Sequence, residues 1–196
     1  SRRLPPKFTL KMDVTAQKPT SGEATLIMLH SLSKGRDGAC HIAANTSGKS
    51  CVVKFFKVKR GEQSRSEIER KLAMQEASRW NEIWEDVTKT KAWTTQLKGR
   101  DHVVVMPYVR TLEDKVGEYK AEVREAISHM ARKGYKHPDL RSDSGPKWHH
   151  VGVRVVEGKL KAVLVDLTDL RKIDKNDGEK VRLAENEMLE ALNLPA

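Results

Sequence analysis

The sequence contains few cysteines, few aromatic residues and no long apolar run. Two cysteines, Cys40 and Cys51, are too few for a disulfide framework, so we expect free thiols. No CxxC or HExxH spacing indicates a zinc site. Every apolar run is shorter than the roughly 18 residues that a membrane-spanning helix needs, and the opening stretch SRRLPPKF has no apolar signal core. We therefore expect neither a disulfide-stapled scaffold nor a membrane partner.

Positive charge is present in excess. The chain of 196 residues has 37 Lys and Arg against 27 Asp and Glu, which gives a formal net charge of +10. Such a balance favours anionic partners such as nucleic acid, phosphate groups or acidic proteins. Hydrophobic residues make up 38% of the chain, a share typical of a folded domain rather than a disordered chain. The length suits one large domain or two small lobes.

Hydrophobic periodicity predicts antiparallel strands interrupted by three helices. Residues 1–22 are predicted to be a lead-in segment with one short strand candidate, FTLKMDV. Strands in antiparallel runs with helices segregated between them define an α+β class. We expect residues 23–109 to form a sheet with one helix, and residues 110–196 to form a second part. The predicted strands lie in residues 24–31, 39–44, 51–58, 91–97, 102–109, 151–156 and 159–166, and the predicted helices span 64–88, 112–133 and 177–193, with a polar loop at 135–148.

A lysine and a glutamate stand in apolar surroundings in this plan. Lys54 lies in the middle of the strand CVVKFF, and Glu76 projects from the apolar stripe of the helix at residues 64–88. A buried carboxylate is costly without a partner, so we predict an ion pair between these two side chains. The alternative for Lys54 is the solvated face of an edge strand. Glu69 lies off the apolar stripe, and we expect it in solvent.

Three further segments carry residues suited to phosphate chemistry. They are the strand VVVMPYV at residues 103–109, the loop YKHPDL at 135–140 and the strand end VLVDLT at 163–168. Phosphoryl transfer requires cations on the phosphates, carboxylates that hold Mg²⁺ and a base near the acceptor hydroxyl. Lys54 offers the cation, and Asp139 and Asp166 offer the carboxylates.

In this order and spacing, residues 24–170 resemble a protein kinase. The resemblance implies a two-lobed, protein-kinase-like α+β fold with an antiparallel N-lobe sheet, and it implies ATP and Mg²⁺ as ligands. Lys54 is similar to the strand lysine that contacts the phosphates, and Glu76 to the helix glutamate that pairs with it. Met106 and Tyr108 belong to a segment similar to the hinge that hydrogen-bonds adenine.

The resemblance implies two roles in the second part of the chain. Asp139 is similar to the catalytic base of the His-Arg-Asp-Leu loop, with Pro138 in place of the arginine. Asp166 is similar to the metal-binding aspartate of the Asp-Phe-Gly motif. The implied activity is transfer of phosphate to protein serine or threonine.

The sequence departs from the kinase pattern at several places. Gly35 and Gly38 stand near the position of the phosphate-binding loop without completing GxGxxG. A six-residue insertion at 142–147 shifts the metal-binding Asn position, and without it His150 falls there, although imidazole suits softer ions than Mg²⁺. Only 30 residues follow Asp166, so we expect a truncated C-lobe without an activation segment.

A narrower resemblance concerns the segment WHHVGV at residues 148–153 and the helix residues Glu76, Ala77 and Trp80. It is similar to the compact kinase-like C-terminal domains of Crinkler-type effectors from oomycetes and fungi. This resemblance implies an intracellular virulence protein that acts in the nucleus or cytoplasm of a host cell, with host proteins as substrates.

Other interpretations stay open. A catalytically inactive pseudokinase could serve as a basic module that binds nucleic acid or protein, and a truncated lower lobe could be covered by a second copy of the chain. The segment AANTSGKS at residues 43–50 nearly fits a P-loop, although the apolar run after it favours a hairpin turn. A metal-dependent hydrolase or nuclease would use a cluster of histidine and aspartate residues: His137, His149, His150, Asp139 and Asp143.

Overall fold

The computed structural model describes residues 7–12, 23–34, 38–45, 49–58, 64–97, 101–112 and 116–195. The chain divides into two compact units. Unit one consists of Ser1–Asn81 and Thr90–Tyr108, and unit two consists of Glu82–Lys89 and Val109–Ala196. None of the helices in the described ranges combines the length and apolar character that a bilayer crossing requires. Cys40 and Cys51 are free thiols, as predicted.

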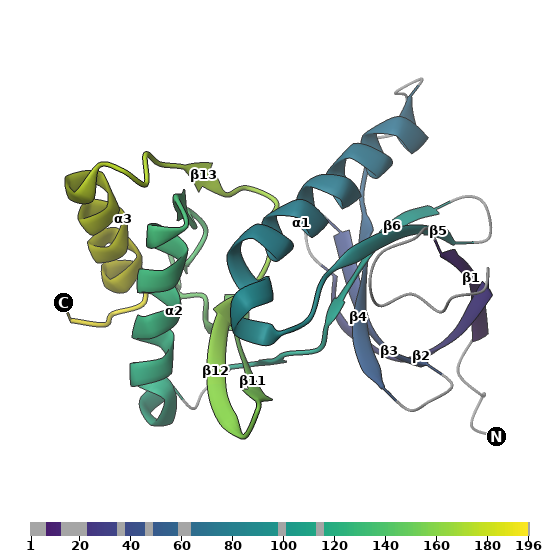
Figure 1. Cartoon of the computed structure of the whole chain (residues 1–196), viewed down its shortest axis with the longest axis horizontal. Coiled ribbons are helices and arrows are strands. Elements are labelled where there is room, and N and C mark those ends of the chain that lie inside the picture. The colour runs from purple at the N-terminus through teal and green to yellow at the C-terminus, as the bar shows by residue number, and fades with distance from the viewer. Residues whose placement is uncertain are drawn as a thin grey trace. The chain divides into compact units, whose positions relative to one another are not determined.

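Unit one contains a closed barrel of antiparallel strands in the order β1-β2-β3-β4-β6-β5 (Figure 1). The predicted meander and the two later strands are present in it. The predicted lead-in segment contains β1, which pairs with β2 on one side and closes the barrel against β5 on the other. The sequence pattern gave no sign of this closure. The strands are β1 (Lys7–Met12), β2 (Glu23–Lys34), β3 (Gly38–Asn45), β4 (Ser50–Phe56), β5 (Trp93–Leu97) and β6 (Asp101–Pro107).

Side-chain alternation along β4 separates the barrel core from the opposite face of the sheet. Val53 is fully buried in a core cluster with residues of β2, β3, β5 and β6, and Cys51 and Phe55 pack against the same cluster. Val52, Lys54 and Phe56 alternate with these residues and are also buried. Lys54 therefore lies on the face of β4 that is turned away from the barrel core.

The connection between β3 and β4 belongs to a hairpin. The two strands pair in antiparallel register from Gly38↔Phe56 to Ala44↔Ser50. A P-loop would continue into a helix, whose N-terminus binds the phosphate. Here the strand β4 follows, so the P-loop interpretation of residues 43–50 is wrong; residues 46–48 themselves lie outside the described part of the chain.

Helix α1 (Arg65–Thr88) matches the helix predicted from the apolar stripe. The indole Nε1 of Trp80 donates to the backbone oxygen of Thr90 at 3.3 Å. The expectation for Glu69 is wrong, because its exposed fraction is only 4%. Arg65 lies one turn earlier and donates from Nε to Glu69 Oε1 at 2.8 Å, which provides the charge partner that burial requires.

Unit two contains the end of α1, the helices α2 and α3, and a small antiparallel sheet of order β12-β11-β7. Figure 1 labels α2, α3, β11 and β12 of this unit. Helix α2 packs against both β12 and α3. The predicted helix 112–133 begins later than expected, because residues 116–119 form a separate 3-10 turn before α2. The elements of this unit are β7 (Arg110–Thr111), the 3-10 turn η1 (Val116–Tyr119), α2 (Lys120–Arg132), β11 (Val151–Val156), β12 (Lys159–Leu164) and α3 (Gly178–Ala191).

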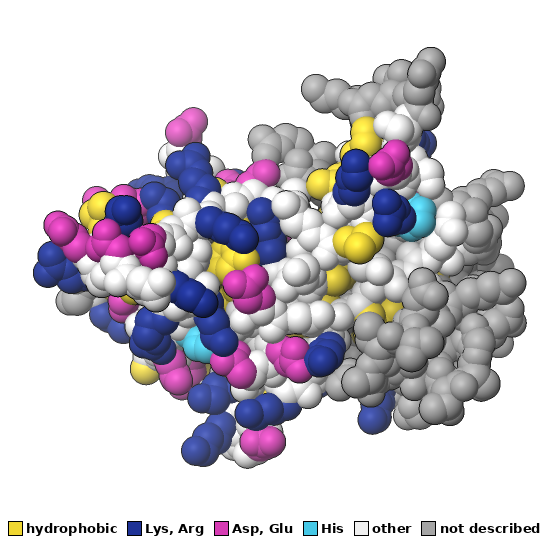
Figure 2. All heavy atoms as spheres, turned by 45° about the horizontal axis from the view of Figure 1, so that its top comes forward, with side chains coloured by type: hydrophobic (Ala, Val, Ile, Leu, Met, Phe, Trp, Pro, Cys, Tyr) yellow, Lys and Arg dark blue, Asp and Glu magenta, His cyan; other side chains and the backbone are white. Residues whose placement is uncertain are grey.

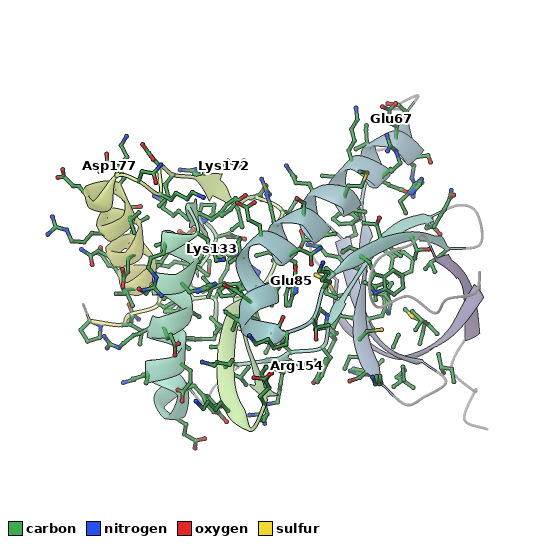
Figure 3. All side chains as sticks on the ribbon, in the orientation of Figure 1. Glu67, Glu85, Lys133, Arg154, Lys172 and Asp177 are labelled. Carbon is green, nitrogen blue, oxygen red and sulfur yellow. The ribbon has the colours of Figure 1, made fainter. Side chains whose placement is uncertain are left out.

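Helix α3 begins at a capping aspartate, as predicted. The carboxylate of Asp177 accepts hydrogen bonds from the backbone N–H groups of Glu179 and Lys180, and this residue lies at the start of α3 in Figure 3. These bonds satisfy donors that have no partner inside the helix, and they hold the pKa of Asp177 below its usual value.

The predicted polar loop 135–148 contains short paired segments. Two of them form a miniature hairpin, and a third pairs with a segment that follows Leu170. These contacts fix the backbone around Asp139. The segments are β8 (Tyr135–Lys136), β9 (Arg141–Ser142), β10 (Gly145–Pro146), the 3-10 turn η2 (Trp148–His150) and β13 (Arg171–Lys172).

Candidate functional site

Unit one contains the predicted ion pair. Lys54 Nζ lies 3.2 Å from Glu76 Oε1, and the residues are 5% and 2% exposed. Strand β4 presents the lysine on the face away from the barrel core, and α1 supplies the glutamate. The lysine ammonium also lies 5.4 Å from the centre of the Phe56 ring, which adds a favourable cation–π contact.

The burial of this pair matters for its interpretation. Two charges taken from water lose several kcal/mol of solvation each, and a pair of well-packed apolar side chains is often as stable. Fold stability alone therefore does not account for a lysine and a glutamate here.

The predicted adenine-binding segment lies at the end of β6. Met106 pairs with Val52 of β4, whereas the pairing of β6 with β5 reaches only as far as Val105. The backbone of Met106 therefore extends beyond the last residue that β5 pairs with. Tyr108 is partly exposed and follows the end of this strand.

One of the two candidate loop glycines has a packing role. A Cβ atom at Gly38 would lie 1.9 Å from the backbone oxygen of Phe55, so any larger residue would push β3 away from β4. The close approach of these two strands is sufficient to explain Gly38 without a phosphate. Gly35 lies outside the described residues.

In unit two, the His137 ring anchors the loop that carries Asp139. Its Nε2 donates to the backbone oxygen of Val165 at 2.9 Å, and its Nδ1 accepts from the backbone N–H of Asp139 at 3.2 Å. The ring thereby connects the residue before Asp166 to the loop at Asp139. Because both nitrogens are engaged, His137 positions this loop and offers no lone pair to a metal ion.

The six-residue insertion closes on itself. The backbone N–H of Lys147 donates to the oxygen of Leu140 at 2.8 Å, and β9 pairs with β10 inside the loop. This closure brings the Lys147 ammonium against the carboxylate of Asp139, with which it forms an ion pair. Lys147 is the functional candidate that the sequence reasoning missed, since its nearness to Asp139 depends on loop closure and leaves no spacing signal.

His150 and Asp166 lie close to each other in unit two. His150 Nδ1 lies 2.7 Å from the backbone oxygen of Asp139, and its Nε2 lies 3.5 Å from Asp166 Oδ2. Thr168 Oγ1 donates to Asp166 Oδ1 at 3.1 Å. The prediction that β12 runs to Asp166 is wrong: β12 ends at Leu164, and the chain turns at Asp166, where φ is 60°. Aspartate tolerates this left-handed conformation better than most residues.

Burial shifts the protonation of the histidines in this cluster. It lowers the pKa of both His137 and His150, and the nearby carboxylates of Asp139 and Asp166 oppose part of this effect. The pKa of the more exposed His149 is lowered as well, by partial burial and by the positive charges of His150 and Lys147 when they are present. A lowered pKa favours the neutral imidazole near pH 7.

Three side chains can converge on one ion. The nearest ligand atoms of Asp139, His150 and Asp166 all lie within 4.8 Å of one another. Carboxylate oxygens are the ligands that Mg²⁺ prefers, so the two aspartates fit a divalent cation. Of the histidine and aspartate residues predicted as a hydrolase-type cluster, only Asp139 and His150 belong to this group; Asp143 and His149 do not.

Comparison with solved structures identifies the fold as kinase-like. A crystal structure of Rio2 kinase from Chaetomium thermophilum matches with a TM-score of 0.51 and 15% identity over 84% of this chain. A second structure, the Rio2 kinase-ADP/Mg²⁺-phosphoaspartate complex from the same organism, matches with a TM-score of 0.50 and 12% identity, also over 84% of this chain. The chain spans 56% and 54% of these two proteins.

The sequence itself belongs to the Family of unknown function (DUF5898), whose pattern matches residues 31–153. The matched range includes Lys54, Glu76, Asp139 and His150, and it ends before Asp166. No curated protein sequence matches the chain.

Proposed function

We propose that this chain binds ATP together with a divalent metal ion and transfers the terminal phosphate to a serine or threonine hydroxyl of a protein. The buried ion pair of Lys54 and Glu76 carries the proposal, because it holds a cation in a place where apolar residues would serve stability equally well. The kinase-like fold supports the same conclusion.

Lys54 and Glu76 act on the nucleotide in this proposal. The Lys54 ammonium binds the phosphates, and Glu76 keeps the ammonium oriented and charged. The backbone of Met106 and Tyr108 hydrogen-bonds the adenine. The pairing of β6 with β5 ends at Val105, which supports this role for the residues that follow.

The second group of residues acts on the metal ion and the acceptor. Asp166 and His150 hold the ion, which neutralises developing charge on the phosphates when it is bound. Asp139 accepts the proton of the acceptor hydroxyl. The hydroxyl oxygen forms the new bond to the terminal phosphorus, and the bond between that phosphorus and the ADP oxygen breaks. Lys147 pairs with Asp139 in the structure, so the acceptor hydroxyl has to share or displace this contact.

The contact between Lys147 and Asp139 also favours a second candidate function. The ammonium group of Lys147 occupies the carboxylate that would have to contact the acceptor hydroxyl, which suits an inactive pseudokinase that binds nucleic acid or protein. The net charge of +10 agrees with an anionic partner. Figure 2 shows Lys and Arg side chains interleaved with Asp and Glu over the described surface of one face, rather than gathered in a patch of one sign. Phosphotransfer is therefore our first proposal.

The cellular setting is part of the proposal. The motif WHHVGV at residues 148–153 supports a Crinkler-type effector that acts on host proteins in the nucleus or cytoplasm of a host cell. Infection with a strain that expresses a fluorescent fusion of the chain would test this location. Retention of the fusion in the producing organism would contradict it.

Calorimetric titration of ATP in the presence of Mg²⁺ tests the nucleotide site. We expect saturable binding to the parent chain and at least about tenfold weaker binding to Lys54→Met and Asp166→Asn, a loss of about 1.4 kcal/mol. Lys71→Met serves as the matched control, because this lysine lies exposed on α1 and pairs only with Glu67 among the contacts described. Equal affinities for all four proteins, with folding confirmed by circular dichroism, would contradict the proposal and favour the binding module.

A further inference from the structure

The cluster in unit two offers a nitrogen ligand together with two carboxylates. The ligand atoms of Asp139, His150 and Asp166 lie within 4.8 Å of one another. Two of the three groups are carboxylates, and the Lys147 ammonium pairs with one of them, Asp139.

Hydrogen bonding fixes how the imidazole of His150 is presented. A backbone carbonyl can only accept, so the contact of 2.7 Å with the Asp139 oxygen places the ring hydrogen on Nδ1. In the neutral ring this leaves a lone pair on Nε2. Metal-binding histidines usually donate their other ring N–H to a carbonyl or carboxylate in this way.

The lone pair of Nε2 faces an oxygen that also carries lone pairs. Asp166 Oδ2 lies 3.5 Å from Nε2. Two hydrogen-bond acceptors this close repel each other unless a proton or a metal ion lies between them. Thr168 occupies the other carboxylate oxygen, Oδ1, by donating its hydroxyl hydrogen. The threonine thus orients Asp166 so that Oδ2 is turned toward the histidine.

We propose that His150 and Asp166, with Asp139 beside them, bind a divalent first-row transition-metal ion, and that they bind it in preference to Mg²⁺. Imidazole suits transition metals, and affinity for a mixed nitrogen and oxygen site rises from Mn²⁺ toward Co²⁺ and Zn²⁺, whereas Mg²⁺ favours oxygen and water. The statement that this ion accompanies the nucleotide rests on the proposed function. Binding of the ion itself requires no nucleotide.

The test measures Mn²⁺ and Mg²⁺ binding to the metal-free full chain without nucleotide. We expect Mn²⁺ to bind at least about tenfold more tightly than Mg²⁺ in calorimetry. Electron spin-echo spectra of the Mn²⁺ complex should contain coupling to an imidazole nitrogen. Equal affinity for the two ions, or a Mn²⁺ complex without nitrogen coupling, would overturn the proposal.

Exchange of the histidine for an oxygen ligand sharpens the test. His150→Asn should weaken Mn²⁺ binding at least about tenfold, bring the two affinities close together and remove the nitrogen coupling. His30→Asn is the control, because this histidine is exposed on β2 and does not belong to the cluster. If His150→Asn fails to fold, the spectrum of the parent complex still decides the question.

Separate titrations distinguish this inference from the proposed function. Mn²⁺ binding with nitrogen coupling but no ATP binding would support the metal site and contradict the nucleotide proposal. ATP binding without any ion preference, and without nitrogen coupling, would leave the nucleotide proposal intact and overturn the inference.

Discussion

In unit one the charged groups of the candidate site form a closed pair, whereas in unit two they form an open, partly exposed cluster. Lys54 and Glu76 are almost fully buried and lie in contact with each other. The side chains of Asp139 and Asp166 remain 39% and 32% exposed. The Lys54–Glu76 pair is therefore shielded from solvent, whereas the carboxylates of Asp139 and Asp166 are accessible to water and ligands.

The largest expected effect tests the closed pair. Glu76→Ala removes the carboxylate that contacts the buried Lys54 ammonium at 3.2 Å, and we expect a loss of about 3–5 kcal/mol in the free energy of unfolding. Urea denaturation followed by tryptophan fluorescence measures this loss. The double substitution Lys54→Met with Glu76→Leu should recover most of the stability, because it removes both buried charges.

A solvated pair on the same helix provides the control. Lys71 and Glu67 lie 3.1 Å apart on α1 and are mostly exposed, so Lys71→Ala should cost no more than about 0.5 kcal/mol. A cost for Glu76→Ala as small as that for Lys71→Ala would remove the contrast between the closed pair and a surface ion pair.

The next effect concerns the histidine that positions the loop of unit two. His137→Phe keeps the ring volume but removes the bonds to the Val165 oxygen and the Asp139 N–H. We expect a loss of about 1–3 kcal/mol in the free energy of unfolding, because buried polar groups lose their partners. A loss below the level of Lys71→Ala would mean that the loop keeps its position without His137.

The pH dependence of stability follows from the same residue. Burial lowers the pKa of His137 from its ordinary 6.5 in the folded chain, so below pH 6.5 the unfolded chain binds more protons than the folded one. The stabilising contribution is complete above that pH and is lost as the pH falls toward the folded-state pKa. Denaturation midpoints between pH 8 and pH 5 should decline in the parent chain, and the decline should be smaller in His137→Phe.

A smaller effect tests the openness of the cluster. Lys147→Ala removes the positive charge beside Asp139, and we expect Mn²⁺ affinity to rise by up to about fivefold, or about 1 kcal/mol for a partly exposed pair. Lys133→Ala is the matched control, because Lys133 pairs with Asp86 at 3.0 Å, and that aspartate does not belong to the cluster. Unchanged affinity in Lys147→Ala would show that the lysine does not compete with the ion.

The smallest effect concerns the attachment of the loop to α3. Arg141 donates from one guanidinium nitrogen to the Asn193 Oδ1 at 2.8 Å and to the Ala191 oxygen at 3.3 Å. Because this contact is exposed, Arg141→Ala should lower the free energy of unfolding by about 0.5–1 kcal/mol and change Mn²⁺ affinity less than twofold. A larger loss of affinity would mean that α3 helps to position Asp139.

Local sequence signals predicted the elements better than their closure. The apolar stripe predicted α1, and Asp177 predicted the start of α3. Closure of the barrel through β1 depends on pairing between strands far apart in the chain, which no local period reveals. The burial of Glu69 depends on Arg65 one turn earlier, and a stripe drawn from apolar residues alone omits such a pair.

The candidate site divides in the same way. The Lys54–Glu76 pair followed from two charges in apolar surroundings, whereas the assignment of His150 to the metal-binding Asn position stays a prediction. The contacts of Lys147 and Thr168 with the two aspartates did not follow from sequence. Both depend on the exact path of the backbone through a loop and a left-handed turn at Asp166.

The closed base of the insertion at 142–147 has a consequence for how this site can change over evolution. The backbone N–H of Lys147 donates to the backbone oxygen of Leu140. The two ends of the hairpin therefore lie close together. Loss or growth of this hairpin would therefore leave Asp139 and His150 in place while altering which charge stands beside the aspartate. A chain with a different hairpin here would keep Asp139 and His150 at the same distance from each other and differ only in the side chain beside Asp139.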